Sequence, residues 1–271
     1  MKGFILSFRS EFYKTRKTMA FWSAVLLPLL LCALLFVGFY GTNNDKLVHE
    51  PGVMLLLQFA GAILAVMGSL ILPMLIVFIA YSVNSIEHKA DTWKTLFSLP
   101  ISKLSVFGAK YFYAFFLVFI CLLLFVLFTL GFGNLLSVVK PALRFNEYHI
   151  EDVLAKVYLK LFLSSLGILS IQFLLSLLFR DFLKPMGIGF VATITGVILA
   201  GNNWKYAFWF PYSHPLLAIQ ALENSAHEKP GPGGMPQISV EIFSREIFIS
   251  LAFALVVFIA GYFIVLKKSV K

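Results

Sequence analysis

The chain has 271 residues, of which 60% are hydrophobic and only 13% are charged. This composition excludes a soluble globular domain, in which about 25% of the residues are charged. The formal net charge of +9 fits a membrane protein whose basic residues gather on one side and face anionic headgroups, so no nucleic-acid partner is expected. The sequence predicts an all-α polytopic membrane protein.

Six apolar segments approach the length of about 20 residues that a bilayer-spanning helix requires. They predict a transmembrane domain over residues 20–266. The second segment contains Pro73, which removes a backbone hydrogen bond and predicts a kink. The fifth segment is the weakest, because it contains several glycines and threonines, and it can extend to Trp204. The predicted spans are Ala20–Tyr40, Leu55–Tyr81, Val106–Leu130, Leu161–Leu178, Met186–Ala200 and Ile247–Leu266.

Lysine and arginine are distributed unequally between the two sides of this domain. Fourteen of the 22 lie in the N-terminal segment, in the loops on the same side and in the basic tail 267–271. This excess predicts that both termini lie in the cytoplasm. The connections 134–160 and 202–246 are then external, and the aromatic cluster at 204–212 is typical of a membrane interface. The long charged leader does not fit a cleaved signal peptide.

Residues 1–19 carry Phe4, Phe8 and Phe12, whose spacing places the aromatic side chains on one face of a helix. Basic and polar residues occupy other parts of the same helical wheel. The pattern predicts an amphipathic helix that lies in the headgroup plane before the chain enters the bilayer. The alternative is a disordered basic tail that only fixes the orientation of the first span.

The segment 85–103 joins the second and third spans. On a helical wheel its apolar residues fall on one face and its polar residues on the other. The apolar face holds Ile86, Ala90, Trp93 and Phe97, and the polar face holds Glu87, His88, Asp91, Lys94 and Thr95. Leu99 precedes Pro100 and therefore ends the helix. The pattern predicts a helix over 85–99 that lies flat on the cytoplasmic surface and offers its polar face to a soluble partner. An ordinary interfacial loop is the alternative.

Three polar residues of the fourth span, Ser165, Gln172 and Ser176, share one helix face. Polar side chains in a membrane span face the interior of the bundle. Interhelical packing and a substrate pathway are both compatible with this pattern, and packing is the commoner role. Thr193 of the fifth span, with glycines on the same face, is open to the same two interpretations.

No sequence pattern supports catalysis or metal binding. A phosphate-binding loop, a His-Glu-x-x-His motif and a Gly-x-Ser-x-Gly elbow are all absent, so no catalytic residue and no metal ligand is predicted. Cys32 and Cys121 lie inside spans and are expected to be packing residues. The predicted spans contain essentially no ionisable residue, which argues against an ion-coupled carrier. Energy for transport would then come from another polypeptide.

The order of these features resembles the permease subunits of ABC-2 type transporters, and especially their bacitracin- and lantibiotic-immunity branch. The resemblance covers the whole chain in topology but only residues 85–110 in motif. It rests on the basic N-terminal helix, the run Glu87–Leu96, the run Leu99–Lys103, and Lys110 at the start of the third span.

The resemblance implies a six-span permease in a bacterial cytoplasmic membrane, with no enzymatic activity of its own. A second copy or a sibling permease would pair with cytoplasmic P-loop ATPase subunits, and those subunits would bind the ATP. The segment 85–99 would be the coupling helix. Glu87, Asp91 and Lys94 would contact the ATPase. The implied coupling residues are Glu87, His88, Asp91, Trp93, Lys94, Phe97, Leu99 and Pro100, with Trp93 and Phe97 as anchors in the membrane surface.

The expected cargo is a hydrophobic or amphipathic compound, such as an exported antimicrobial peptide. A self-sufficient secondary transporter, a membrane anchor for a cytoplasmic complex and an intramembrane enzyme are the alternatives. The lack of intramembrane charges counts against the secondary transporter, and the lack of a catalytic constellation counts against the enzyme. A bound P-loop ATPase would distinguish the ATP-driven permease from all three.

Overall fold

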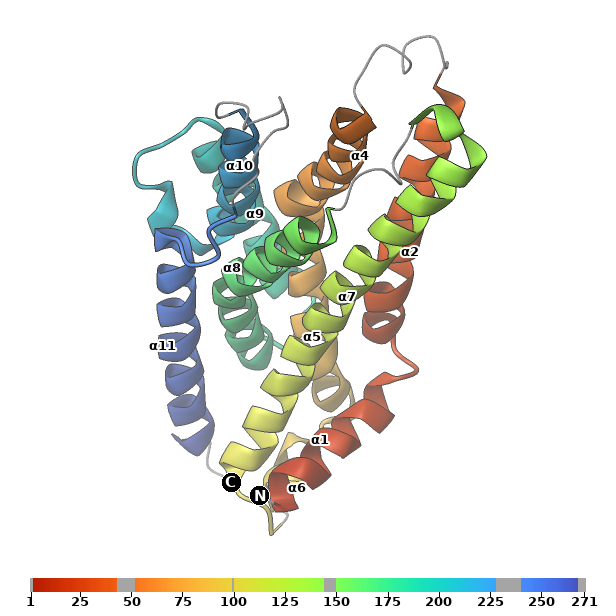
Figure 1. Ribbon diagram of the computed structural model, residues 1–271. Coiled ribbons are helices and arrows are strands. Elements are labelled where there is room, and N and C mark those ends of the chain that lie inside the picture. The colour runs from red at the N-terminus through yellow and green to blue at the C-terminus, as the bar shows by residue number, and fades with distance from the viewer. Residues whose placement is uncertain (1, 43–51, 99, 144–149, 228–239, 268–271) are drawn as a thin grey trace.

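The computed structural model describes residues 2–42, 52–98, 100–143, 150–227 and 240–267. Within these ranges the protein is helical, without strands, and six helices are long and apolar enough to cross a membrane (Figure 1). The predicted all-α polytopic fold is therefore confirmed. The candidate spans are Met19–Gly41, Leu55–Ala90, Lys103–Val139, Glu151–Leu178, Leu183–Gly201 and Arg245–Lys267.

The spans are joined by shorter helical elements. In chain order the helices are α1 (Lys2–Thr15), α2 (Met19–Gly41), α4 (Gly52–Val66), η1 (Met67–Ile71), α5 (Leu72–Ala90), α6 (Trp93–Ser98), α7 (Lys103–Val139), η2 (Pro141–Leu143), α8 (Glu151–Leu178), α9 (Leu183–Gly201), η4 (Ala207–Trp209), η5 (Pro211–Ser213), α10 (His214–His227) and α11 (Arg245–Lys267). The segment η1 is a π-helix, and the other η segments are 3₁₀ turns.

The two ends of the bundle differ in what they hold. The start of α1, the whole of α6 and the end of α11 lie at one end, which we call the basic end (Figure 1). There the Lys103 ammonium at the start of α7 donates to the Leu266 carbonyl of α11 over 3.3 Å. The helices α2 and α7 end at the other end, which we call the opposite end. The fold thus places α1 and the segment after α5 together, as the charge distribution requires.

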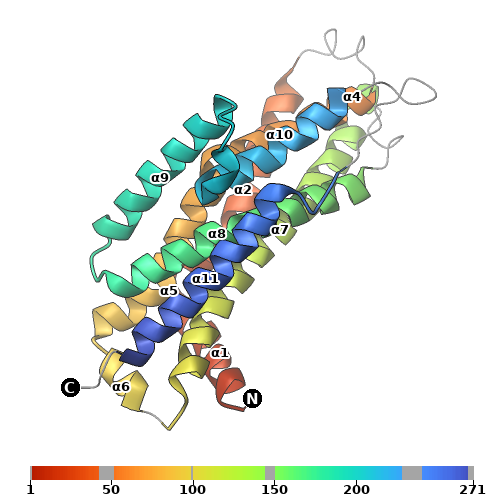
Figure 2. The ribbon, with the colours of Figure 1, turned by 90° about the vertical axis from the view of Figure 1, so that its left-hand side faces the viewer.

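The helix α8 forms the centre of the bundle. It packs against α11, α5, α7 and α10, and Figure 2 shows α8 and α11 side by side. Most of its residues between Leu161 and Leu177 are buried. Because α8 is surrounded by protein, its polar side chains find partners in neighbouring helices rather than in lipid.

The second span is kinked as Pro73 predicts, but the departure from α-helix geometry precedes the proline. The π-helical turn Met67–Ile71 lies between α4 and α5. Pro73 has no N–H for the Ser69 carbonyl, and a π turn is a common way to accommodate such a gap. At Gly68 an added Cβ would lie 2.0 Å from Ile219 Cδ1 of α10. A glycine here therefore lets α10 approach the kinked span.

The segment 202–246, which the sequence predicts to be an external loop, contains helical elements over the part that the structure describes. Its aromatic residues form η4 and η5, and α10 then folds back against α8 and α9. A Cβ at Gly196 of α9 would lie 2.5 Å from the Tyr212 backbone of η5, so the approach of η5 to α9 depends on a glycine. The ring of His214 is buried and its Nε2 lies 2.9 Å from the Phe208 carbonyl.

The predicted N-terminal helix is present as α1, but its phenylalanines do not share one lipid-facing surface. Phe4 packs edge-on against Phe112 of α7 with ring centroids 5.8 Å apart, and Phe8 packs against Tyr113 at 5.9 Å. Phe12 is 39% exposed and lies against Phe21 of α2. The helix α1 is therefore docked on the bundle, because α7 continues far enough to receive its aromatic face.

Candidate functional site

The segment between α5 and α7 forms the site that the sequence analysis singled out. The helix α5 continues to Ala90, and Asp91 then adopts a left-handed conformation with φ 50° and ψ 32°. The Glu87 carbonyl accepts the Thr92 N–H over 3.1 Å. A new short helix, α6, begins at Trp93. The prediction of one flat helix over 85–99 is therefore wrong, because the left-handed residue divides the segment into the end of a span and a separate surface helix.

Several predicted coupling residues lie at the surface of the basic end. Asp91 is exposed and pairs with Arg180, in the connection between α8 and α9, over 3.0 Å. Pro100 is exposed, and His88 and Trp93 are half-buried. The exposed Asp91–Arg180 pair contributes little to stability because water screens both charges. Lys94 and Phe97 belong to α6, but their side chains and the whole of Leu99 lie outside the described residues.

Glu87 is not on the exposed face that the helical wheel assigns to it. Its side chain is 2% exposed, and its carboxylate lies 2.5 Å from the Lys110 ammonium of α7 and 3.0 Å from that of Lys14 of α1. The wheel separates apolar from polar residues but does not show which neighbours cover each face. Because α1 docks over the end of α5, the carboxylate is enclosed by protein and is not exposed at the surface.

Glu87 belongs to a group of two carboxylates and two ammonium groups that we call the basic-end cluster: Glu11, Lys14, Glu87 and Lys110. The Lys110 ammonium bridges Glu87 and Glu11, with 2.8 Å to the Glu11 carboxylate, and it also donates to the Val83 carbonyl over 3.3 Å. Lys14 lies 3.3 Å from Glu11. Buried charges are tolerated only when they are paired, and the formal charges of this cluster sum to zero.

Lys14 forms the outer edge of the cluster, with a side chain that is 32% exposed. Partial burial of its ammonium works to lower its pKa, but the carboxylates of Glu11 and Glu87 outweigh this effect and raise the pKa above its ordinary value. The charged form of Lys14 is therefore the form that the folded protein stabilises.

Trp93 connects α6 to the bundle through both parts of its side chain. Its indole N–H donates to His88 Nδ1 over 3.2 Å. Since Nδ1 accepts, His88 Nε2 carries the proton and donates to the Ser176 carbonyl of α8 over 3.0 Å. The indole ring lies 5.6 Å from the Lys110 ammonium. These contacts join Trp93 to protein groups, and its predicted role as a membrane-surface anchor stays a prediction.

The four candidate pathway residues are all buried and hydrogen-bonded inside the bundle. Ser176 accepts from Asn84 of α5 over 2.7 Å, and the Gln172 amide donates to the Tyr212 hydroxyl over 2.6 Å. The hydroxyls of Ser165 and Thr193 donate to carbonyls of their own helices. These contacts fit the packing alternative, and a pathway role stays a prediction.

A second buried ion pair lies towards the opposite end, where the sequence analysis expected no membrane charge. The Lys160 ammonium of α8 lies 3.4 Å from the Glu246 carboxylate of α11. Lys160 and Glu246 fall just outside the predicted apolar segments. The helices are longer than those segments, so the charges are carried into the bundle and must pair there.

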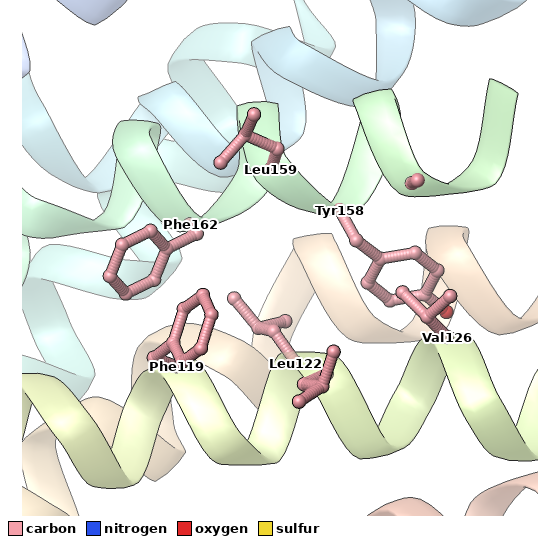
Figure 3. Close-up of a pocket in the computed structure, with 8 residues that line it drawn as sticks. Phe119, Leu122, Val126, Tyr158, Leu159 and Phe162 are labelled. Atoms are coloured by element: carbon pink, nitrogen blue, oxygen red, sulfur yellow. The ribbon is translucent and has the colours of Figure 1, made fainter. Parts of the chain in front are cut away.

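Two hollows of the membrane region are lined mainly by apolar side chains. Figure 3 shows side chains of α7 and α8 that point toward one another around a cavity of about 210 Å³. Its labelled lining residues are Phe119, Leu122, Val126, Tyr158, Leu159 and Phe162. A larger groove of about 670 Å³ lies between α2 and the kinked second span, where Leu27 and Phe78 are among the lining residues. No group of His, Cys, Asp and Glu side chains in the described ranges could hold a metal ion.

The fold and this site define a polytopic helical membrane protein with charge pairs inside its helix bundle. Residues 7–196 match the model of a family described as ABC-2 family transporter protein. The match covers more than half of the chain, so the chain belongs to this family of multi-pass membrane permeases, which normally work with ATPase partners. No curated protein and no solved structure matches the chain. The match ends within α9, so α10 and α11 lie beyond it.

Proposed function

We propose that this chain is the permease subunit of an ATP-driven exporter in a bacterial cytoplasmic membrane, with its basic end in the cytoplasm. Membership of the ABC-2 transporter family supports the transport role. The excess of lysine and arginine at the basic end supports this orientation. ATP would be bound and hydrolysed by separate P-loop ATPase subunits, and a second copy or a sibling permease would complete the membrane part.

The observation that carries this proposal is the position of α6. It is a short helix, set apart from α5 by a left-handed residue, and it lies beyond the long helices at the basic end (Figure 1). Thr95 and Ser98 of α6 and the neighbouring Asp91 and Pro100 are exposed. We assign the docking surface to these residues together with Lys94 and Phe97. Glu87 is not part of this docking surface because its carboxylate is buried.

The proposed cargo is a hydrophobic or amphipathic compound, with antimicrobial peptides as the leading class. The groove between α2 and the second span supports this class, because it is lined by apolar side chains over almost all of its surface. An apolar lining favours an apolar ligand through desolvation and contact. It offers no fixed charge that would select an inorganic ion.

The proposal is tested by coexpressing the chain with a P-loop ATPase of the same operon and purifying the complex in detergent. Thr95→Arg combined with Ser98→Arg adds two bulky charges to the exposed side of α6 and should abolish copurification while the chain still inserts. The control, Asp152→Arg with Lys156→Glu, alters exposed charges of α8 at the opposite end and should leave copurification intact. Unchanged binding by the α6 variant would contradict the docking assignment. Binding without any ATP-dependent transport would favour a membrane anchor.

A further inference from the structure

Among the described side chains of α6, Trp93 makes both a hydrogen bond and a cation–π contact to the rest of the bundle. We propose that Trp93 and His88 are positioning residues that transmit a displacement of α6 to α1, α5, α7 and α8. This inference rests on the proposed docking role of α6 and names the groups that would carry the coupling. It concerns the position of side chains, since neither residue would touch cargo or ATP.

The backbone alone couples α6 weakly to the span before it. Asp91 has a positive φ, and Thr92 follows it outside both helices. A left-handed residue interrupts the ladder of α-helical hydrogen bonds, so α6 can move relative to α5 without bending a continuous helix. Side-chain contacts are therefore the more direct route by which a displacement of α6 reaches the bundle.

The first of these contacts leads to α8. The Trp93 indole N–H, which can only donate, lies 3.2 Å from His88 Nδ1, and His88 Nε2 lies 3.0 Å from the Ser176 carbonyl. The Ser176 hydroxyl donates in turn to the Ala80 carbonyl of α5 over 2.9 Å. The chain of donors and acceptors thus runs from α6 through the end of α5 to α8, the central helix.

The second contact leads to α1 and α7. The Trp93 ring lies 5.6 Å from the Lys110 ammonium, within the range of a cation–π attraction. Lys110 is 1% exposed and bridges the carboxylates of Glu11 and Glu87. Separating buried opposite charges is strongly unfavourable, so the helices that carry the cluster must shift together rather than apart. Trp93 therefore lies where both connections meet.

The test uses the full chain in lipid nanodiscs, alone and with its ATPase. Trp93→Leu removes both connections, while Trp93→Phe keeps a ring near Lys110 and removes only the donor to His88. Trp209→Leu is the matched control, because Trp209 is 59% exposed in η4, away from the basic end. If Trp93→Leu does not fold, Trp93→Phe decides the outcome.

In the chain alone, the inference predicts that Trp93→Leu accelerates amide exchange about fivefold or more in α6, in residues 11–15 of α1 and at the end of α8. The loss of one typical hydrogen bond changes the equilibrium constant for local opening by about fivefold. Trp93→Phe should accelerate exchange in α6 and α8 but spare α1. Acceleration confined to α6 in both variants would overturn the inference, and Trp209→Leu should change none of these segments.

In the complex, a cysteine at Ser82, which lines a groove near the basic end, reports the conformation by its rate of maleimide labelling. ATP with vanadate should change this rate in the otherwise unaltered complex. The Trp93→Leu variant should still bind the ATPase, but ATP with vanadate should no longer alter its labelling rate. An alteration as large as that of the otherwise unaltered complex would overturn the inference. Failure of the unaltered chain to bind the ATPase would refute the proposed function instead, and the exchange data would then decide the inference alone.

Discussion

The two buried charge sites of this protein differ in how they join helices. The basic-end cluster has two acidic and two basic side chains from three helices, and Lys110 is enclosed between two carboxylates. The pair Lys160–Glu246 towards the opposite end joins only α8 and α11. The first site therefore adds charge pairing among three helices to the aromatic contacts that hold α1 on α7, whereas the second adds one ion pair to the closely packed interface of two helices.

The interface between α8 and α11 shows this packing in detail. The Ser250 hydroxyl of α11 accepts the Gly167 N–H of α8 over 3.0 Å and donates to the Ser164 carbonyl over 2.9 Å. A Cβ at Gly167 would lie 3.2 Å from the Ser250 Oγ. Removing a charged side chain should consequently reduce the free energy of unfolding more at the basic end than at the opposite end.

The largest effect is expected for Lys110→Met. The substitution keeps the approximate volume of the side chain but leaves the carboxylates of Glu11 and Glu87 buried, with only Lys14 as a partner. Breaking a buried ion pair in this way reduces stability by about 3–5 kcal/mol. The free energy of unfolding in mixed micelles should fall by this amount, while Lys156→Met, on the exposed surface of α8, should leave it unchanged. A loss below about 1 kcal/mol would show that the cluster is not held by its charges.

A smaller effect is expected for Lys160→Met. Glu246 is 13% exposed and also accepts a hydrogen bond from the Ser244 hydroxyl, so its carboxylate keeps other partners when Lys160 is lost. We expect a loss of about 1–3 kcal/mol, the usual range for a buried polar group that loses one partner. The same unfolding measurement applies. A loss greater than that of Lys110→Met would reverse the comparison between the two sites.

Ser250→Ala should reduce stability by about 1 kcal/mol, because it removes the hydroxyl that joins α11 to the backbone of α8. The control is Ser23→Ala in α2, whose hydroxyl donates to a carbonyl of its own helix and should matter less. Equal losses for the two variants would indicate that the α8–α11 interface is held by apolar contacts alone.

The smallest effect is a pH dependence carried by Lys14. Its raised pKa means that the folded state stabilises the charged form, so this contribution is fully present below the ordinary lysine pKa of 10.5 and is lost as the pH rises through the raised value. Because the side chain is partly exposed, the contribution should be about 1 kcal/mol or less. Between neutral pH and pH values above the raised pKa, the stability difference between the unaltered chain and Lys14→Met should shrink. A constant difference would contradict the pairing of Lys14 with Glu11 and Glu87.

The fold could be predicted from the sequence where apolar length decides the structure. The six spans, the N-terminal helix and the kink near Pro73 all follow from hydrophobicity, periodicity or proline chemistry. The packed helix α10 could not be predicted in this way, because its sequence is mixed in polarity. Its position depends instead on Gly68, which faces Ile219 of α10, and on Gly196, which faces the backbone of η5 immediately before α10.

The site was predictable only in part. The sequence singled out 85–103 as the candidate segment and placed Asp91 at its surface, where the structure has it, but it also assigned Glu87 to the surface. A helical wheel gives the angular order of side chains within one helix and not the helix that covers them. The charges at Glu11 and Lys110, 99 residues apart in the chain, become partners only when α1 folds onto α7. Glu11, an acidic residue inside an otherwise basic amphipathic helix, was the available signal for such a pairing, since buried acids require a cationic partner.

The central claim is that α6 is the surface to which an ATPase binds, and a photocrosslink tests it most directly. A photoreactive amino acid at Thr95, which is exposed on α6, should crosslink to the coexpressed P-loop ATPase in intact cells. The same amino acid at Asp152, exposed on α8 at the opposite end, should give no such product. A crosslink from Asp152, or none from Thr95 while the two proteins copurify, would contradict the claim.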